Sequence, residues 1–185
     1  DGMGGANGGN IASSTAVKTI SEQISSSYRQ GMGANSIRNM LQSAVCAANL
    51  NIFDMAKSVE ALSGMGTTVV VTLICDGVAH IVHAGDSRAY LLSGKKMKQI
   101  TRDHSIVQTM LEAGQLTEEE ARVHPRKNVI TRALGVDEEV EIDYDEVELR
   151  RDDAILICTD GLTNYVENSA ILKIINQTSF YECPE

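Results

Sequence analysis

The 185-residue sequence contains no tryptophan, only two prolines and four cysteines. None of the cysteines forms a C-x-x-C pair, and we expect buried, reduced thiols in a cytosolic protein. No apolar run approaches the roughly 18 residues that a membrane span needs, and there is no signal peptide. A chain of this length buries enough surface to form a core without disulfides or a structural metal.

The chain also lacks an excess of positive charge. Its 16 lysines and arginines are outnumbered by 25 aspartates and glutamates, which gives a formal net charge of −9. This balance argues against nucleic acid or an anionic membrane as the main partner. An acidic chain can still bind a phosphorylated substrate when metal ions supply positive charge. Without repeats, low-complexity stretches or linkers, residues 1–185 are expected to form a single domain.

The order of elements is readable from apolar periodicity. Apolar residues at helical spacing predict two helices, over residues 9–28 and 37–59. The β-branched run at residues 67–75 predicts a buried strand, and Asp76-Gly77 a hairpin turn to the next one. A second hairpin is expected around Ser93-Gly94. Several antiparallel strands should therefore follow two helices.

The rest of the chain mixes helical and strand patterns. Two short helical pieces at about residues 104–127 predict an insertion between strands, with a capping box formed by Thr117 and Glu120. Apolar and acidic residues alternate over residues 140–149, as in a strand. The apolar residues change from even to odd positions part-way along, which predicts a bulge near Asp145-Glu146. A further buried strand ends at Asp160, and a final helix carries three apolar residues, Ile171, Leu172 and Ile175.

Three aspartates stand where an apolar strand meets a loop. Asp1 precedes a glycine-rich stretch, and Asp86 and Asp160 each close a strand. A single Asp-Gly pair is usually only a turn, and Asp76-Gly77 fits that reading. Several converging carboxylates, however, repel one another unless a cation lies between them. Mg²⁺ and Mn²⁺ prefer such all-oxygen ligands, so these aspartates are candidate metal ligands.

The contexts of these aspartates match a known family. The motifs, in chain order, are DGMGG at residues 1–5, GTT at 66–68, HAGDSRAYLL at 83–92, ITRDHS at 100–105, RALG at 132–135 and CTDGLTN at 158–164. Together they resemble the metal-dependent Ser/Thr protein phosphatases of the protein phosphatase 2C type, in particular the bacterial branch. The resemblance implies an α+β fold, a β-sandwich of two antiparallel sheets flanked by helix pairs in α-β-β-α layers. The insertion at 104–127 resembles the flap of that family.

The resemblance also implies a site and a reaction. Asp1 would bridge two metal ions, with the Gly2 carbonyl oxygen on one and Asp160 on the other. Asp86 would share a third ion with Asp160. Asp1 and Asp160 are thus the candidate catalytic residues, and Mg²⁺ or Mn²⁺ the expected cofactor. A metal-bridging hydroxide would hydrolyse phosphoserine or phosphothreonine in protein substrates, with a Ser/Thr kinase as the usual partner and the cytoplasm as the location.

Other residues receive secondary roles. Arg88 is expected to support its loop by pairing with carboxylates, and His104 to anchor the flap. His124 lies in the flap, where exposure or contact with substrate is expected rather than proton transfer. Asn128 lies in a stretch that could face the third ion. Some family members place a proton-donating histidine directly after the first Asp-Gly, where this chain has Met3.

The sequence departs from the family pattern at both ends. It begins after the family's N-terminal strand pair and stops before its last strands. We therefore expect a sandwich that is incomplete at the N- and C-termini, with weaker metal binding and low turnover. Unpaired sheet edges would then favour a dimer or strand exchange.

Three other functions compete with an active phosphatase. A catalytically impaired phosphatase-like module could bind a partner without turnover. A regulatory phosphatase of the sporulation or stress-response type would act on a phosphorylated regulator, but those relatives tend to lack a long flap. A calcium-binding domain is a further alternative, although no EF-hand spacing is present. The acidic stretch from Glu139 to Glu148 is expected to be a solvated strand face.

Overall fold

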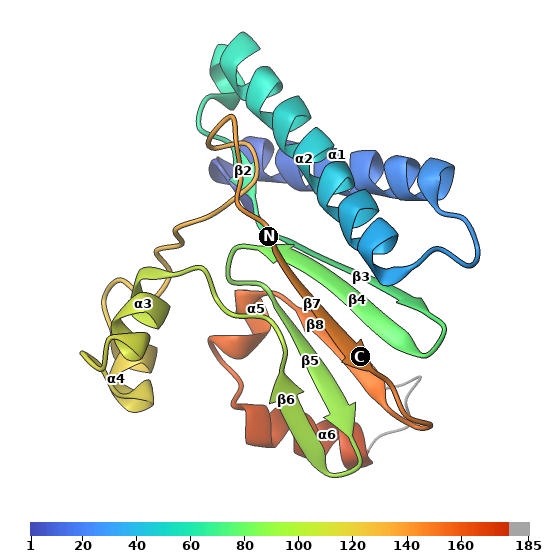
Figure 1. Ribbon diagram of the computed structural model, residues 1–185. Coiled ribbons are helices and arrows are strands. Elements are labelled where there is room, and N and C mark those ends of the chain that lie inside the picture. The colour runs from blue at the N-terminus through green and yellow to red at the C-terminus, as the bar shows by residue number, and fades with distance from the viewer. Residues whose placement is uncertain (178–185) are drawn as a thin grey trace.

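The computed structural model describes residues 1–177, apart from the side chains of Ala6 and Asn7. Two three-stranded antiparallel sheets face each other, with two long helices over one and a shorter helix against the other (Figure 1). The layered α+β arrangement expected from the sequence is therefore confirmed. The layers matter for function because they bring the ends of strands from both sheets to one end of the molecule.

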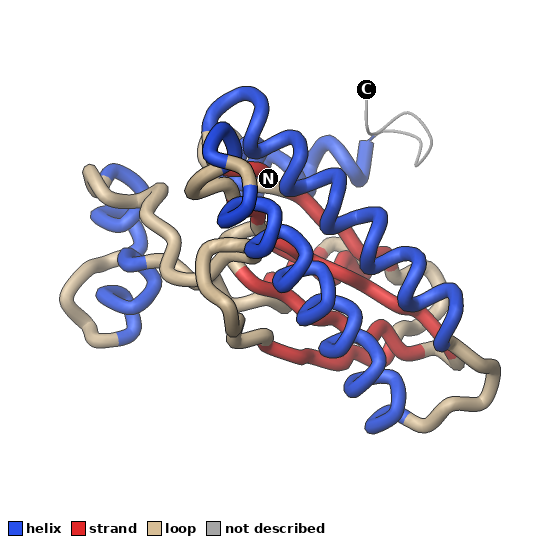
Figure 2. Tube along the Cα trace, turned by 90° about the horizontal axis from the view of Figure 1, so that it is seen from above, coloured by secondary structure: helices blue, strands red, loops and turns tan. Residues whose placement is uncertain are grey.

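The helix layer consists of α1 (Gly5–Ser27) and α2 (Ala34–Ser58), which lie over the sheets in Figure 2. Small buried residues on α1, such as Ala12 and Ala16, let α2 approach closely. Most of the apolar positions predicted for the second helix are buried, among them Leu41 and Val45, but Val59 is exposed and lies just past the end of α2. These residues form the main core with the near face of the first sheet.

The first sheet has the strand order β3-β4-β7, with bounds β3 (Val69–Cys75), β4 (Val78–Ala84) and β7 (Asp143–Glu148). The turn between β3 and β4 is the predicted one. Asp76 and Gly77 have φ values of 50° and 76°, and two successive positive φ values give the twist that a two-residue hairpin requires.

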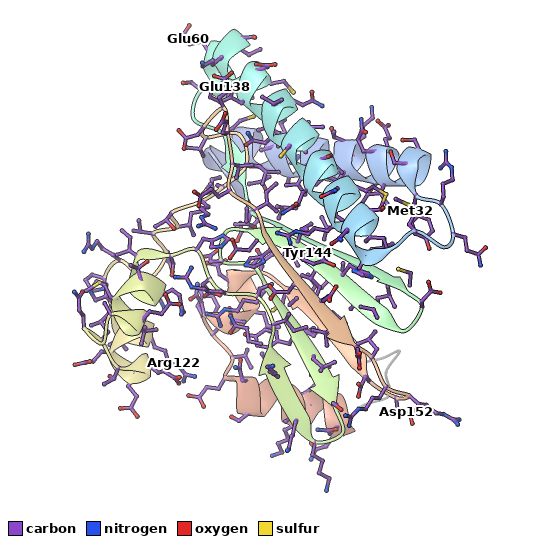
Figure 3. All side chains as sticks on the ribbon, viewed as in Figure 1. Met32, Glu60, Arg122, Glu138, Tyr144 and Asp152 are labelled. Carbon is purple, nitrogen blue, oxygen red and sulfur yellow. The ribbon has the colours of Figure 1, made fainter. Side chains whose placement is uncertain are left out.

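The predicted bulge at Asp145-Glu146 is wrong. The ladder between β4 and β7 runs without interruption from Val78–Glu148 to His83–Asp143. Tyr144 packs against the helix-side core, between α2 and the sheet in Figure 3, whereas Leu149 packs in the core between the sheets. Both faces of this segment are covered, so apolar residues occur at odd and at even positions. The change from one to the other therefore needs no bulge.

The second sheet has the order β6-β5-β8, with bounds β5 (Arg88–Ser93), β6 (Lys96–Gln99) and β8 (Ala154–Cys158). The hairpin predicted around Ser93-Gly94 is confirmed, since Ser93 pairs with Lys96. Small side chains from both sheets, among them Ala79 and Ala89, form the inter-sheet core with Ile81. The small residues allow the two sheets to lie close together.

The insertion forms α3 (Ile106–Glu112) and α4 (Glu118–Val123), which stand to one side of the sandwich in Figure 1. The predicted capping box of Thr117 and Glu120 is present, with both reciprocal hydrogen bonds. A bridge between Ser105 and Ile130 closes the base of the insertion. We call residues 104–130 the flap, and its role as a flap stays a prediction.

The remaining elements are short or lie near the chain ends: β1 (Gly2–Met3), η1 (Glu60–Leu62), β2 (Gly66–Thr67), α5 (Asp160–Thr163) and α6 (Asn168–Gln177). The final helix predicted around Ile171 is α6, which lies against β6. Within residues 1–177, no helix combines the length and the apolar character needed to cross a membrane.

The cysteines only partly match their expected burial. Cys75 and Cys158 are half-buried free thiols, but Cys46 is exposed on the solvent side of α2. The expectation of a buried thiol is therefore wrong for Cys46, because neighbouring positions on a helix point in different directions and only one face meets the sheet. Cys183 lies outside the described residues.

Candidate functional site

The loop that carries Asp1 is held by the GTT motif. Gly2 pairs with Thr67 in the short β1–β2 ladder. The Asp1 carbonyl oxygen accepts hydrogen bonds from the Thr68 N–H and the Thr67 hydroxyl, each at 3.0 Å. Asp1 and Gly2 themselves are exposed. Two buried threonines thus hold the backbone of Asp1, and its exposed side-chain carboxylate oxygens can bind a ligand.

The same loop lies directly on the first turns of α1. A Cβ atom on Gly9 would lie 2.5 Å from the Gly2 carbonyl oxygen, and one on Gly2 would lie 1.9 Å from the Gly9 oxygen. Such separations are possible only between glycines. The glycines that follow Asp1 therefore set the depth at which the Asp1 loop lies against the helix.

The loop that carries Asp86 contacts Thr68, one of these two threonines. Gly85 has a φ of +111°, and a Cβ atom there would lie 2.6 Å from the Thr68 side chain. On the other side of Asp86, the Ser87 hydroxyl is 2.7 Å from the Thr68 hydroxyl. Thr68 therefore contacts both the Asp1 loop and the residues that flank Asp86, and it fixes their relative position.

Asp160 follows β8 and is the first residue of α5. The Asn164 side-chain amide donates a hydrogen bond of 2.8 Å to Asp160 Oδ2 and one of 3.3 Å to Asn128 Oδ1 in the flap. Asn164 had no role in the sequence analysis. Its four-residue spacing from Asp160 was the available signal, because residues four apart meet on one side of a helical turn.

The three aspartate segments converge at one end of the sandwich. The charges of Asp160 and Asp86 both act on the Asp1 amino group, whose pKa is nevertheless lowered by burial. A groove of about 430 Å³ beside Asp1 runs between α1, β3 and β8, and neither Asp86 nor Asp160 lines it. The half-buried Asp86 has its pKa raised to about 6, first by burial and then by the negative charges of Asp160 and Asp103. The structure thus brings together residues that lie up to 159 positions apart in the sequence.

The donor set fits hard divalent cations. The candidate ligands are all oxygens. The raised pKa of Asp86 reflects first its burial and then repulsion from Asp160, and a bound cation would offset both. Among the described residues, the group whose ligand atoms all lie within 4.8 Å of one another is His83, His104 and Asp143 rather than the three aspartates. A centre of two ions about 3.5–4 Å apart spreads its ligands more widely than that.

Arg88 and His124, which the sequence places outside the metal ligands, have well-defined contacts. Arg88 makes a bidentate pair with the buried Asp103, at 2.9 Å to Oδ1 and 2.6 Å to Oδ2, and it also donates to the Tyr90 hydroxyl. The prediction that Arg88 pairs with a carboxylate is confirmed. His124 Nδ1 accepts a hydrogen bond from the Arg126 N–H within the flap.

The sequence profile of the family described as protein phosphatase 2C matches residues 1–182. The chain belongs to this family. The match covers every motif on which the resemblance rests, and it includes Asp1, Asp86 and Asp160.

Known relatives agree with this membership. The Serine/threonine phosphatase stp of Listeria innocua is 39% identical over 175 residues, which are 95% of this chain and 69% of that protein. The structure of the S. agalactiae serine/threonine phosphatase has a TM-score of 0.92 at 32% identity, over 100% of this chain and 75% of that one. The catalytic domain of PstP, solved in complex with 2 manganese ions, has a TM-score of 0.82 at 35% identity, over 95% and 71%.

We expect the Asp86→Asn variant of the metal-free protein to be more stable than the wild type at pH 7.5. The folded-state pKa of Asp86, about 6, lies above the ordinary value of 3.8. Its protonation therefore adds stability that is fully present below about pH 4 and is lost as the pH rises through about 6. Allowing for solvent screening, we expect a gain of about 1 kcal/mol, or roughly 2–4 °C in Tm.

Thermal unfolding in a chelator, recorded between pH 4 and 8, measures this effect. The gain should shrink as the pH falls towards 4. Asp54→Asn, on the exposed side of α2, is the matched control and should leave Tm unchanged. An Asp86→Asn variant less stable than the wild type at pH 7.5 would show that Asp86 is not repelled by its neighbours.

Proposed function

We propose that this protein is a metal-dependent phosphatase that removes phosphate from phosphoserine and phosphothreonine in proteins. Family membership supports the class of reaction. The observation that carries the proposal is the closeness of Asp1, Asp86 and Asp160, since the charges of Asp86 and Asp160 act on each other and on the Asp1 amino group. An alternative role as a module that binds without turnover has no comparable support, because the candidate ligands and their anchoring threonines are present.

Each residue has a distinct task in this proposal. Asp1, the Gly2 carbonyl and Asp160 would hold two ions, and Asp86 with Asp160 would hold a third. The ions, when bound, supply an activated water at neutral pH and offset the charge of the phosphoryl oxygens.

The surrounding residues keep these ligands in place. Thr67 and Thr68 hold the Asp1 backbone, and the Asn164 amide orients one oxygen of Asp160. Arg88 is occupied by Asp103 and supports the loop rather than the phosphate.

We further propose Mg²⁺ or Mn²⁺ as the cofactor, in two or three copies. A relative solved with 2 manganese ions supports this choice. The substrates would be phosphorylated proteins, and the reaction that supplies them is phosphate transfer by a Ser/Thr kinase. A cytoplasmic location follows from that substrate class and remains part of the proposal.

A dimer or strand exchange is proposed for the sheet edges beside the groove. Among residues 1–177, β3 pairs only with β4, and β8 pairs only with β5. Free strand edges are templates for pairing with another chain. Light scattering would test this proposal, and a monodisperse monomer at high concentration would contradict it.

The function is tested by metal-dependent hydrolysis of phosphopeptides. We expect release of phosphate from phosphoserine and phosphothreonine peptides in Mn²⁺, little release from a matched phosphotyrosine peptide, and loss of activity in a chelator that is restored by added Mn²⁺. Turnover that is unaffected by chelation would contradict a metal-dependent mechanism. Mn²⁺ binding without any turnover would favour the binding module instead.

A further inference from the structure

A single buried histidine satisfies both backbone groups of Gly85, the residue before Asp86. The backbone N–H of His104 donates to the Gly85 carbonyl oxygen at 2.9 Å. The Gly85 N–H in turn donates to His104 Nδ1 at 3.1 Å. His104 is only 2% exposed, so water does not compete for these bonds. The loop of Asp86 is thereby held by His104 as well as by Thr68.

The protonation state of the ring follows from this contact. Since Nδ1 accepts from Gly85, the neutral ring carries its proton on Nε2, which lies 3.2 Å from Asp143 Oδ2. Burial lowers the pKa of His104 and so favours the neutral form. Arg132 Nη1 donates to the other oxygen of Asp143 at 2.8 Å and keeps that carboxylate in place. The same Nη1 lies 3.0 Å from His104 Nε2, where its positive charge disfavours a charged imidazole ring. Gly85 and Asp143 thus favour the neutral tautomer that accepts at Nδ1, and Arg132 acts on it through Asp143.

The same cluster is unsuited to hold a metal ion. The rings of His83 and His104 are stacked, with centroids 4.8 Å apart and planes within 8° of parallel. Imidazole nitrogens bind a metal in the plane of the ring, and two stacked parallel planes cannot contain one common ion. The Arg132 guanidinium also occupies the space beside Asp143. The cluster is therefore a support and not a metal centre.

His104 also joins the two ends of the flap. Its carbonyl oxygen accepts from the Thr131 N–H at 2.8 Å, and the next residue, Ser105, bridges to Ile130. The stacked His83 donates from Nε2 to the Arg102 carbonyl oxygen at 2.9 Å and steadies the segment that leads into the flap. One residue therefore contacts the entry of the flap, its exit and the loop of Asp86.

We propose that His104 is a positioning residue that fixes the loop of Asp86 through Gly85 and ties it to the base of the flap. The inference rests on the proposed function, because it assumes that Asp86 holds an ion. Partners that orient a metal ligand are worth about 10–100-fold in metal affinity. A displaced flap would move Gly85, and with it the Asp86 carboxylate.

Two substitutions of His104 separate its contacts. His104→Asn keeps an acceptor at the place of Nδ1, because the Asn oxygen is also bonded to Cγ. His104→Gln carries its amide to the region of Nε2 and loses the acceptor for Gly85. His80→Asn is the matched control, since His80 is buried on the same strand as His83 but contacts Tyr144 instead.

We expect calorimetric Mn²⁺ titrations to show about 10–100-fold weaker binding at the Asp86 site in His104→Gln. The affected step is identified as the one that Asp86→Asn removes. His104→Asn should stay close to wild type, and so should His80→Asn despite its lower Tm. Hydrogen exchange at the Gly85 amide, measured without metal, should be fast only in His104→Gln.

Each outcome decides the inference. Wild-type Mn²⁺ affinity together with a protected Gly85 amide in His104→Gln would overturn it. Equal losses in all three histidine variants would also overturn it, because they would follow general destabilisation rather than the Gly85 contact. If the wild type binds no Mn²⁺, the proposed function fails, whereas the Gly85 exchange rates still test the positioning role.

Discussion

Replacement of Asp160 by asparagine is expected to lower Mn²⁺-dependent turnover of p-nitrophenyl phosphate by about 10³-fold or more. The change removes one negative charge but keeps the shape of the side chain and an oxygen that can accept from Asn164. Metal ions contribute several kcal/mol of transition-state stabilisation, and each 1.36 kcal/mol is a factor of ten in rate. Because Asp160 is the proposed ligand of two ions, its loss should remove most of that contribution.

Initial rates at saturating Mn²⁺ measure this loss, with Asp76→Asn as the matched control. Asp76 lies in the turn between β3 and β4 at a φ of 50°, a conformation that asparagine adopts readily. The control should therefore keep wild-type activity and stability. Retention of more than a tenth of the activity in Asp160→Asn would show that Asp160 is not an essential ligand.

The Gly9→Ala variant is expected to lose about 100-fold in turnover, although helix propensity alone predicts a gain. Alanine is favoured over glycine within a helix by about 1 kcal/mol. At Gly9, however, the added Cβ would lie 2.5 Å from the Gly2 carbonyl oxygen and 3.0 Å from the Met3 nitrogen. The loop must move away, and a displacement of about 1 Å near a reacting centre costs roughly 100-fold in rate.

Turnover and Tm measured together distinguish these two effects. The matched control is Gly33→Ala, at the start of α2, where no described atom lies within 4 Å of the added Cβ. It should leave turnover unchanged. A Gly9→Ala variant with wild-type turnover would show that the Asp1 loop can shift without consequence, and it would remove the proposed reason for the glycines after Asp1.

Local patterns explain why the helices and hairpins could be predicted. The buried face of α2 follows directly from residues such as Leu41 and Val45, which repeat at helical spacing. The turn at Asp76-Gly77 follows from the ease with which these two residues adopt positive φ. The bulge failed as a prediction because alternation reports only which faces of a strand are apolar. It does not reveal that a second layer covers the other face of β7.

The candidate site was predictable only in part, and for a related reason. Asp1, Asp86 and Asp160 were found because each belongs to a recognisable motif. Asp143 was assigned to a solvated acidic face, and that expectation is wrong, since it pairs with Arg132 and lies 3.2 Å from His104 Nε2. Its partner residues are far away in the sequence, so no local pattern distinguishes it from its exposed neighbours.

The sequence by itself determined the family, the order of helices and strands and the identity of the three aspartates, because these depend on residue type and short spacing. Only the tertiary structure decided how those aspartates are held. Thr68 meets two loops, Gly9 meets Gly2, and His104 meets Gly85 because sheet pairing and helix packing bring distant backbone segments into contact. Such contacts depend on distances between elements, which are set when the layers close around a common core.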